Sequence, residues 1–178
     1  DGGGNTSIIN ASLVMPPTVP IYDPTTGEYV RLNYLPGSST VPNPVPYVKH
    51  LQDKGTIDRI LASADLTFHI IDGLPLKVSG GADMSNASRE VYEPKETYRG
   101  YNANGIAEQQ SRRSSSYSNE NVLTYIKKIG QHSLNVMVGS SLLYEENKTG
   151  SMTARDFISD VYGYNNLDAG AQWDKPNT

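Results

Sequence analysis

Alternation of apolar and polar side chains begins near Ile57 and dominates the middle of the sequence. In the first alternating run the apolar positions share one parity: Ile60, Ala62, Ala64, Leu66, Phe68 and Ile70. Asp72-Gly73 follows, and then a second run with apolar or small residues at Leu74, Leu76, Val78, Gly80, Ala82 and Met84. Side chains of a strand alternate between its two faces, and Asp-Gly is a strong signal for a tight turn. The pattern therefore predicts two long amphipathic strands joined by a two-residue turn.

A second hairpin is predicted further along the sequence. Residues 122–129 form its first strand, Gly130-Gln131 its turn, and residues 132–144 its return strand. One face of the return strand carries Leu134, Val136, Val138, Leu142 and Tyr144. Between the two hairpins lies a polar stretch, residues 86–118, which is expected to form a long loop.

The first part of the sequence, residues 1–55, lacks this alternation and is expected to form an extended, proline-rich loop. Residues 8–14 predict a helical turn that ends at Met15-Pro16-Pro17. Residues 21–30 predict a small turn between two short extended pieces. Prolines at alternate positions further along favour extended backbone over helix: Pro42, Pro44 and Pro46.

The last part, residues 148–178, is expected to form a loop that contains one short helix. Thr153 is a suitable N-cap for this helix, and Gly163 is a suitable end. The helix would turn three apolar side chains inward: Phe157, Ile158 and Val161.

The predicted fold is all-β, with long antiparallel hairpins and extended loops in a single region, residues 1–178. The two hairpins occupy residues 56–147 and join tight turns at one end to long polar loops at the other. Strands of a soluble sandwich are usually ~5–6 residues long, whereas these approach the ~9–11 residues that a transmembrane strand needs. The hairpins therefore favour a slice of a transmembrane β-barrel, with a soluble β-sandwich as the alternative.

Composition narrows the function classes. A formal net charge of −4 and a pI near 5.3 argue against a nucleic-acid partner. The absence of Cys excludes disulfides and thiolate metal sites, and no apolar run approaches the ~20 residues of a membrane helix. Twelve Tyr against two Phe and one Trp suit a surface that is part wet and part apolar. Such a surface is either a sugar-binding face or the interfacial belt of a barrel.

No residue pattern indicates catalysis, a cofactor or a metal. His50, His69 and His132 lack metal-ligand spacing, and the sequence has no nucleophile elbow, P-loop or dinucleotide fingerprint. Asp156 and Asp160 sit four residues apart on the expected helix, where a solvated face explains them. Four tyrosines of the central polar stretch suit either sugar stacking or loop packing: Tyr92, Tyr98, Tyr101 and Tyr117. The substrate-binding residues stay unknown.

Several short motifs together resemble one family. They are Pro16-Pro17-Thr18-Val19-Pro20-Ile21-Tyr22-Asp23 with Gly27-Glu28-Tyr29, then Asn43-Pro44, Ile70-Ile71-Asp72-Gly73-Leu74, Tyr92-Glu93-Pro94, Asn119-Glu120-Asn121-Val122-Leu123-Thr124-Tyr125 and Gly130-Gln131-His132-Ser133-Leu134. Their order and spacing are similar to those of the SusC/RagA-type TonB-linked outer-membrane transporters of Bacteroidetes. Each motif is short, and the resemblance depends on the order and spacing of the motifs along most of the chain.

The resemblance implies that the chain is a barrel fragment of a longer protein in the bacterial outer membrane. That protein would carry a signal peptide, a plug domain and a TonB-contacting segment. It would work with a SusD-like surface lipoprotein and TonB to import nutrients, with glycans favoured over peptides. It would not be an enzyme and would need no cofactor. The alternative function is a soluble surface carbohydrate-binding β-sandwich or adhesin. No binding residue of the family can be carried over to a position of this sequence.

The barrel interpretation assigns faces and ends to the hairpins. The shared parity predicts that these side chains point to lipid: Ile60, Leu66, Phe68, Leu76, Val78, Val136 and Val138. Asp72-Gly73 and Gly130-Gln131 would face the periplasm, whereas residues 92–117 and the stretch after Asn147 would lie outside the cell. An isolated chain would expose unpaired strand edges and is expected to pair with a second copy through them or to fold its apolar faces together.

Overall fold

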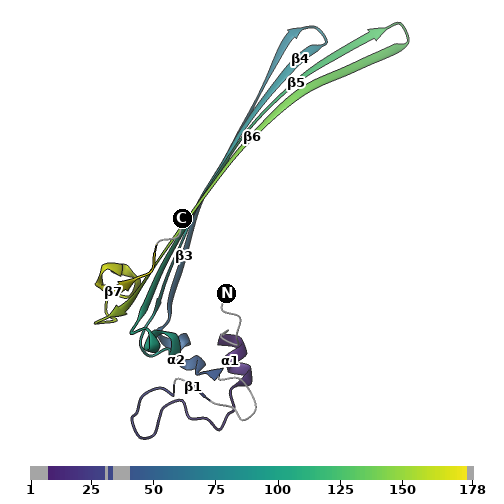
Figure 1. Ribbon diagram of the computed structural model, residues 1–178. Helices are drawn as coiled ribbons and strands as arrows, with labels where there is room; N and C mark the ends of the chain where they lie inside the picture. The colour runs from purple at the N-terminus through teal and green to yellow at the C-terminus, as the bar shows by residue number, and fades with distance from the viewer. Residues whose placement is uncertain (1–7, 31, 34–40, 176–178) are drawn as a thin grey trace. The chain divides into compact units, whose positions relative to one another are not determined.

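A computed structural model describes residues 8–30, 32–33 and 41–175, and an antiparallel sheet of long strands dominates it (Figure 1). The sheet has the strand order β3-β4-β5-β6-β7, so that neighbours along the chain are neighbours in the sheet. Its strands are β3 (Gln52–Ile71), β4 (Leu74–Glu93), β5 (Ile106–Ile129), β6 (His132–Phe157) and β7 (Gly170–Trp173). The predicted all-β class with long antiparallel hairpins is confirmed.

Smaller elements occupy the rest of the described chain. A two-stranded sheet pairs β1 (Leu32–Asn33) with β2 (Val41–Pro42). The helical elements are α1 (Ile8–Val14), α2 (Pro44–His50), α3 (Tyr98–Asn102), and the 3-10 turns η1 (Gly163–Asn165) and η2 (Leu167–Ala169). Among these described helices none has the length and hydropathy of a membrane span.

The chain divides into two compact units, to which β3, β4, β5 and β6 all contribute. The hairpin unit contains residues 56–88 and 111–149, which include both tight turns. The loop unit contains residues 1–55, 89–110 and 150–178, of which the structure describes the ranges given above. Each unit is described below by itself.

Both predicted hairpin turns are confirmed, and glycine makes each of them possible. Gly73 has φ +80, and its carbonyl accepts the Ile126 N–H at 2.7 Å. A Cβ at Gly73 would lie 2.3 Å from the Ile126 carbonyl oxygen, so a larger residue cannot fit without a shift of backbone. Gly130 has φ +60 at the second turn. Positive φ is accessible to Gly at little cost, which explains its position in both turns.

The expected loop over residues 86–118 is wrong for most of its length. β4 continues to Glu93 and β5 begins at Ile106, so that residues 94–105 alone connect them. The strands here carry polar side chains on both faces, which removes the alternation that would identify a half-buried strand. Hydrogen bonding to neighbouring strands makes these segments part of the sheet. An Arg89–Asp53 ion pair at 2.6 Å also joins β4 to β3.

The expected helix over residues 153–163 is also wrong. β6 continues to Phe157, where it pairs antiparallel with β7 through Ala154↔Trp173 and Phe157↔Gly170. Ile158 and Val161 do not face inward but are 93% and 83% exposed. Gly163 begins the turn η1 instead of ending a helix. Residues 154–157 pair with the downstream strand β7, and these hydrogen bonds favour a strand over the helix that the capping residue Thr153 predicted.

The proline-rich stretch was expected to be extended, yet Pro44 and Pro46 lie inside α2. The first four N–H groups of a helix have no partner within the helix, so proline costs little there. Asn43 caps this helix, because its side-chain oxygen accepts the Val45 N–H at 3.0 Å. The helical turn predicted for residues 8–14 is confirmed as α1.

Buried apolar side chains gather in the loop unit. Tyr92 and Phe157 meet edge to face with ring centroids 5.4 Å apart, and three smaller residues complete the cluster: Ala107, Ala154 and Leu167. The hairpin unit, whose residues are all described, has Ser115 as its single buried residue. A sheet normally buries at least one face against another layer, so the hairpin unit is a single sheet layer that needs a cover on its apolar side.

Candidate functional site

The two faces of the hairpin unit can be assigned from contacts between strands. Arg59 of β3 pairs with Asp83 of β4 at 2.6 Å, and Lys77 of β4 lies 3.6 Å from Asp65 of β3. All four residues have odd numbers, and side chains alternate along a strand. Odd-numbered residues of β3 and β4 therefore share one face, and even-numbered residues share the other.

The same reasoning extends across β5 and β6. A Cβ on Gly81 would lie 2.7 Å from the Ser118 hydroxyl, which places odd positions of β4 beside even positions of β5. Tyr117 and Tyr144 meet with ring centroids 6.4 Å apart, which places odd positions of β5 beside even positions of β6. One continuous face therefore contains Ile60, Leu66, Phe68, Leu76, Val78, Leu123, Tyr125, Leu134, Val136, Val138, Leu142 and Tyr144. We call it the apolar face.

The apolar face has the height of a membrane. From Ile60 to Ile70 a strand rises about 34 Å, or about 24 Å along the membrane normal at a tilt of ~45°. The lipid-facing band of an outer-membrane barrel is ~25 Å tall. In the isolated chain the large side chains of the apolar face are exposed to solvent: Leu66 is 61% exposed and Val138 is 67% exposed. The opposite face carries the ion pairs Arg59–Asp83 and Lys77–Asp65 but also exposes Leu61, Met137 and Leu143.

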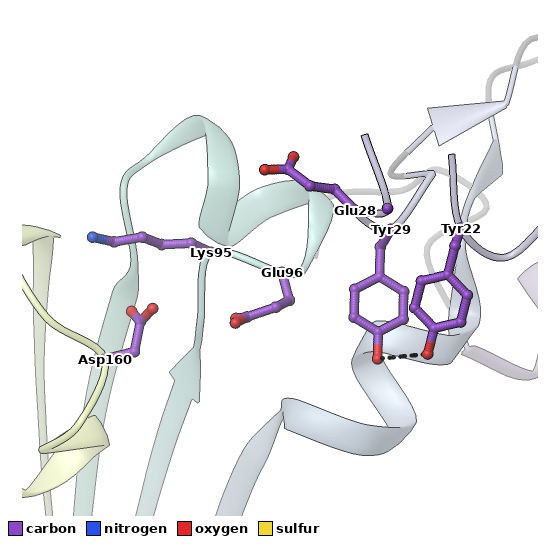
Figure 2. A pocket seen from close by; sticks show the side chains of 7 residues that line it. Tyr22, Glu28, Tyr29, Lys95, Glu96 and Asp160 are labelled. Carbon is purple, nitrogen blue, oxygen red and sulfur yellow. Dashed lines mark hydrogen bonds between the residues drawn. The ribbon is translucent and has the colours of Figure 1, made fainter. Parts of the chain in front are cut away.

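A second feature is a pocket in the loop unit, with a volume of about 380 Å³ (Figure 2). Three separate segments supply its side chains: the turn after α1, the residues that follow β4, and the loop that follows β6. The lining side chains are Tyr22, Glu28, Tyr29, Lys95, Glu96 and Asp160.

The turn that carries the two tyrosines is built locally. Tyr22 and Tyr29 form an antiparallel bridge, which the Asp23 N–H supports by donating to the Glu28 carbonyl at 2.7 Å. Asp23 accepts the Thr25 N–H at 2.7 Å on one carboxylate oxygen, and this hydrogen bond lowers the pKa of Asp23. Gly27 takes φ +72 to close the turn. The predicted small turn between two extended pieces is thereby confirmed.

The Tyr22 and Tyr29 rings lie beside each other with centroids 4.8 Å apart and planes tilted by 32°. Figure 2 shows both rings on one side of the pocket, with their hydroxyl groups joined at 3.5 Å. The Tyr29 hydroxyl also lies 3.1 Å from His50 Nε2, and the His50 ring meets Tyr29 edge-on. Lys49 donates to the Tyr22 hydroxyl at 3.4 Å. These contacts from α2 hold the aromatic wall in place.

The loops on the other side of the pocket contact the buried cluster that contains Tyr92 and Phe157. The Tyr92 hydroxyl donates to Asp160 Oδ1 at 2.5 Å, while the Tyr92 ring packs against Phe157. Burial raises the pKa of Tyr92, and the hydrogen bond to the Asp160 carboxylate raises it further. Lys95 donates to the Ile158 carbonyl at 3.2 Å. The two loops that carry Lys95 and Asp160 are thus fixed by direct contacts within the loop unit.

The loop after β4 is further held by a buried carboxylate. Arg99 donates to Glu93 Oε1 at 2.5 Å and to Glu108 at 3.3 Å, and the Glu93 side chain is 8% exposed. Burial raises the pKa of Glu93, which the neighbouring guanidinium of Arg99 opposes. Thr97 caps α3 by accepting the Gly100 N–H at 3.0 Å. This packing fixes the segment from which Glu96 projects toward the pocket.

The tyrosines singled out from the sequence are not brought together. Tyr92 is buried in the core of the loop unit, Tyr101 is 54% exposed, and Tyr117 contacts Tyr144 in the hairpin unit. The aromatic pair Tyr22–Tyr29 was missed, although its turn was predicted. The signal that could have indicated this pair is an aromatic residue on each side of the turn: Tyr22 directly before Asp23, and Tyr29 two residues after Gly27.

Neither Asp156 nor Asp160 lies on a helix face. Asp156 precedes the last residue of β6, has φ +63, and accepts the Asn104 side-chain N–H at 2.6 Å. Asp160 accepts from Tyr92. His50 contacts Tyr29. Across the described residues no group of three His, Cys, Asp or Glu side chains could hold a metal ion.

Comparison with known proteins finds a relative that matches nearly the whole chain. No protein-family model matches the chain. The TonB-dependent receptor P3 of Formosa agariphila is 27% identical over 177 residues, which is 99% of this chain and 17% of that protein. The chain is thus similar to a TonB-dependent receptor along nearly its whole length. It spans 17% of the length of this receptor.

Solved structures with the same fold match most of the chain. A structure of the RagAB peptide transporter matches 85% of the chain with a TM-score of 0.70 and 19% identity, over 17% of its own length. The RagAB peptide importer in its open-open state matches with a TM-score of 0.68. At such identity the likeness concerns the fold, which is that of a slice of barrel wall. These relatives carry the names of a receptor and of transporters, not of enzymes.

Proposed function

We propose that the chain forms part of the wall of an outer-membrane barrel that imports a nutrient in a TonB-dependent manner. The observation that carries this proposal is the apolar face: a single sheet layer, open on one side, about as tall as the lipid-facing band of an outer-membrane barrel. Lipid would cover this face, because its large apolar side chains form a patch that is unfavourable to leave in contact with water.

The imported solute is proposed to be a peptide. RagAB, the structural relative, is described as a peptide transporter and importer. Glycan import is the second possibility for a receptor of this family, and the pocket chemistry discussed below favours the peptide. A SusD-like surface lipoprotein and TonB are proposed as partners of the whole receptor, by analogy with RagAB and with the name of the Formosa receptor.

The alternative of a soluble sandwich or adhesin lacks a second layer. A β-sandwich buries alternate side chains of each strand between two sheets about 10 Å apart. In the hairpin unit, large side chains of the apolar face such as Leu66 and Val138 are more than half exposed. We therefore propose the membrane as the missing layer.

The orientation gives a direct test of this proposal in the full-length receptor. Epitope tags after Lys95 and after Ser159 should be detected by antibody on intact cells, because the long connections of barrels lie outside. Tags at Asp72-Gly73 and Gly130-Gln131 should become detectable only after the outer membrane is opened. Detection of the turn tags on intact cells together with silent loop tags would overturn the topology, and with it the proposed function.

A further inference from the structure

We propose that the pocket between the Tyr22–Tyr29 pair and the loops at Glu96 and Asp160 binds an organic cation, namely the guanidinium or ammonium group of a basic peptide. That the peptide is an imported solute rests on the proposed function, whereas cation binding depends on the pocket alone. Nothing in the family resemblance assigns a ligand to these residues.

The charges around the pocket favour a cation. Three carboxylates line it, from Glu28, Glu96 and Asp160. Two ammonium groups stand against them: Lys95 in the lining and Lys49, which donates to the Tyr22 hydroxyl at 3.4 Å. Lys95 is directed to the Ile158 carbonyl at 3.2 Å, so part of its hydrogen-bonding capacity is already used. The Glu96 carboxylate makes no hydrogen bond or ion pair with any residue that the structure describes. A cationic ligand would therefore meet an acceptor that the protein leaves available.

The aromatic wall adds a second preference for positive charge. An aromatic ring carries negative potential on its face, and a guanidinium or ammonium within about 6 Å of the ring centroid is attracted to it. Tyr22 is 45% exposed, and its ring lines the same pocket as Tyr29 and Glu96 (Figure 2). The hydrogen bond with Tyr22 raises the pKa of the Tyr29 hydroxyl, and the nearby charge of Glu96 raises it further. The tyrosine rings and the Glu96 carboxylate would therefore attract the same bound cation.

The spacing of the carboxylates favours an organic cation over a metal ion. Among the described residues no three acidic or imidazole side chains converge closely enough to hold a metal. A ligand that reaches both the tyrosines and Asp160 must be larger than an ion. A volume of about 380 Å³ falls at the lower end of the ~300–1,000 Å³ of small-molecule sites. It suits one long basic side chain with its neighbouring peptide groups.

The test is binding to the full-length receptor in detergent, measured by calorimetry. The probes are N-acetylated, C-amidated Gly-Arg-Gly, the same peptide with citrulline in place of arginine, and spermidine. Citrulline keeps the shape of arginine and removes its charge. We expect the arginine peptide to bind at least about fivefold more tightly than the citrulline peptide, in a manner weakened by salt. Spermidine that binds while the arginine peptide does not would overturn the peptide assignment.

Variants of the receptor place the binding in this pocket. Glu96→Gln should weaken binding of the arginine peptide about fivefold or more, whereas Lys95→Met should strengthen it, because the two changes alter the local charge in opposite directions. Glu145→Gln, an exposed carboxylate of β6 in the hairpin unit, is the matched control and should bind as the parent does. Equal affinity for both peptides, no measurable binding, or the same affinity in Glu96→Gln and Glu145→Gln would each overturn the cation site. None of these results would alter the outcome of the epitope-tag test.

Discussion

Leu66→Arg is expected to destabilise the folded receptor in lipid by about 2–4 kcal/mol. Leu66 lies on the apolar face near the middle of its height, between Ile60 and Ile70 on the same strand. A charge on the lipid face at this depth must be buried in hydrocarbon or must locally thin the membrane. The free energy of unfolding of the full-length receptor in phospholipid vesicles, from denaturant titration, measures this cost.

Ser63→Arg is the matched control for this charge. Ser63 belongs to the same strand at a similar height but has odd parity, and its face carries Asp65 and Asp83. An arginine there would meet carboxylates in a polar environment, so we expect a change within about 0.5 kcal/mol. Equal losses from both substitutions would mean that the two faces do not differ in solvent, against the barrel assignment.

Phe157→Ala is expected to cost about 3–5 kcal/mol of local stability in the loop unit. The Phe157 side chain is 1% exposed, packs edge to face on Tyr92, and lies in the main buried cluster of the described chain. Its removal leaves a cavity beneath the Tyr92–Asp160 hydrogen bond. Hydrogen exchange of the full-length receptor should therefore show faster exchange in β7 and in the end of β6.

The neighbouring residue provides the control for this cavity. Ile158 is 93% exposed, so Ile158→Ala removes an apolar side chain without leaving a cavity, and exchange should stay close to that of the parent. If Phe157→Ala were as harmless as Ile158→Ala, the cluster around Tyr92 would not stabilise the pocket walls. The cation site would then lack the rigid support that the structure gives it.

The hairpins could be predicted because one face of each strand is apolar and the other polar. From Ile60 to Ile70 and again from Leu134 to Tyr144 this alternation is nearly unbroken, and glycine marks each turn. Such alternation arises where one face of a strand lies in an apolar environment and the other in a polar one. It fails where a strand has the same surroundings on both faces, as in residues 106–118, where the polar run Ser111 to Ser116 still forms strand β5.

The remaining errors came from partners that are distant in sequence. The expected helix at Thr153 gave way to a ladder with β7, and the extended prolines gave way to a helix whose cap, Asn43, also bonds the Ile21 carbonyl at 3.1 Å. The pocket unites Tyr22, Glu96 and Asp160, which lie on three loops. The register of the long strands brings the loops of Glu96 and Asp160 together, and contacts from α2 hold Tyr22. A local sequence pattern contains neither kind of information.

The central claim, that the hairpin unit separates lipid from a polar interior, can be tested by labelling single cysteines in native outer membranes. The parent sequence has no Cys, so each introduced thiol is the only one in this segment. Leu66→Cys, Val78→Cys and Val138→Cys should resist a charged, membrane-impermeant maleimide, whereas Asp65→Cys, Lys77→Cys and Asn135→Cys should react with it. Reaction of the first three with the last three protected would contradict the assignment of the apolar face to lipid.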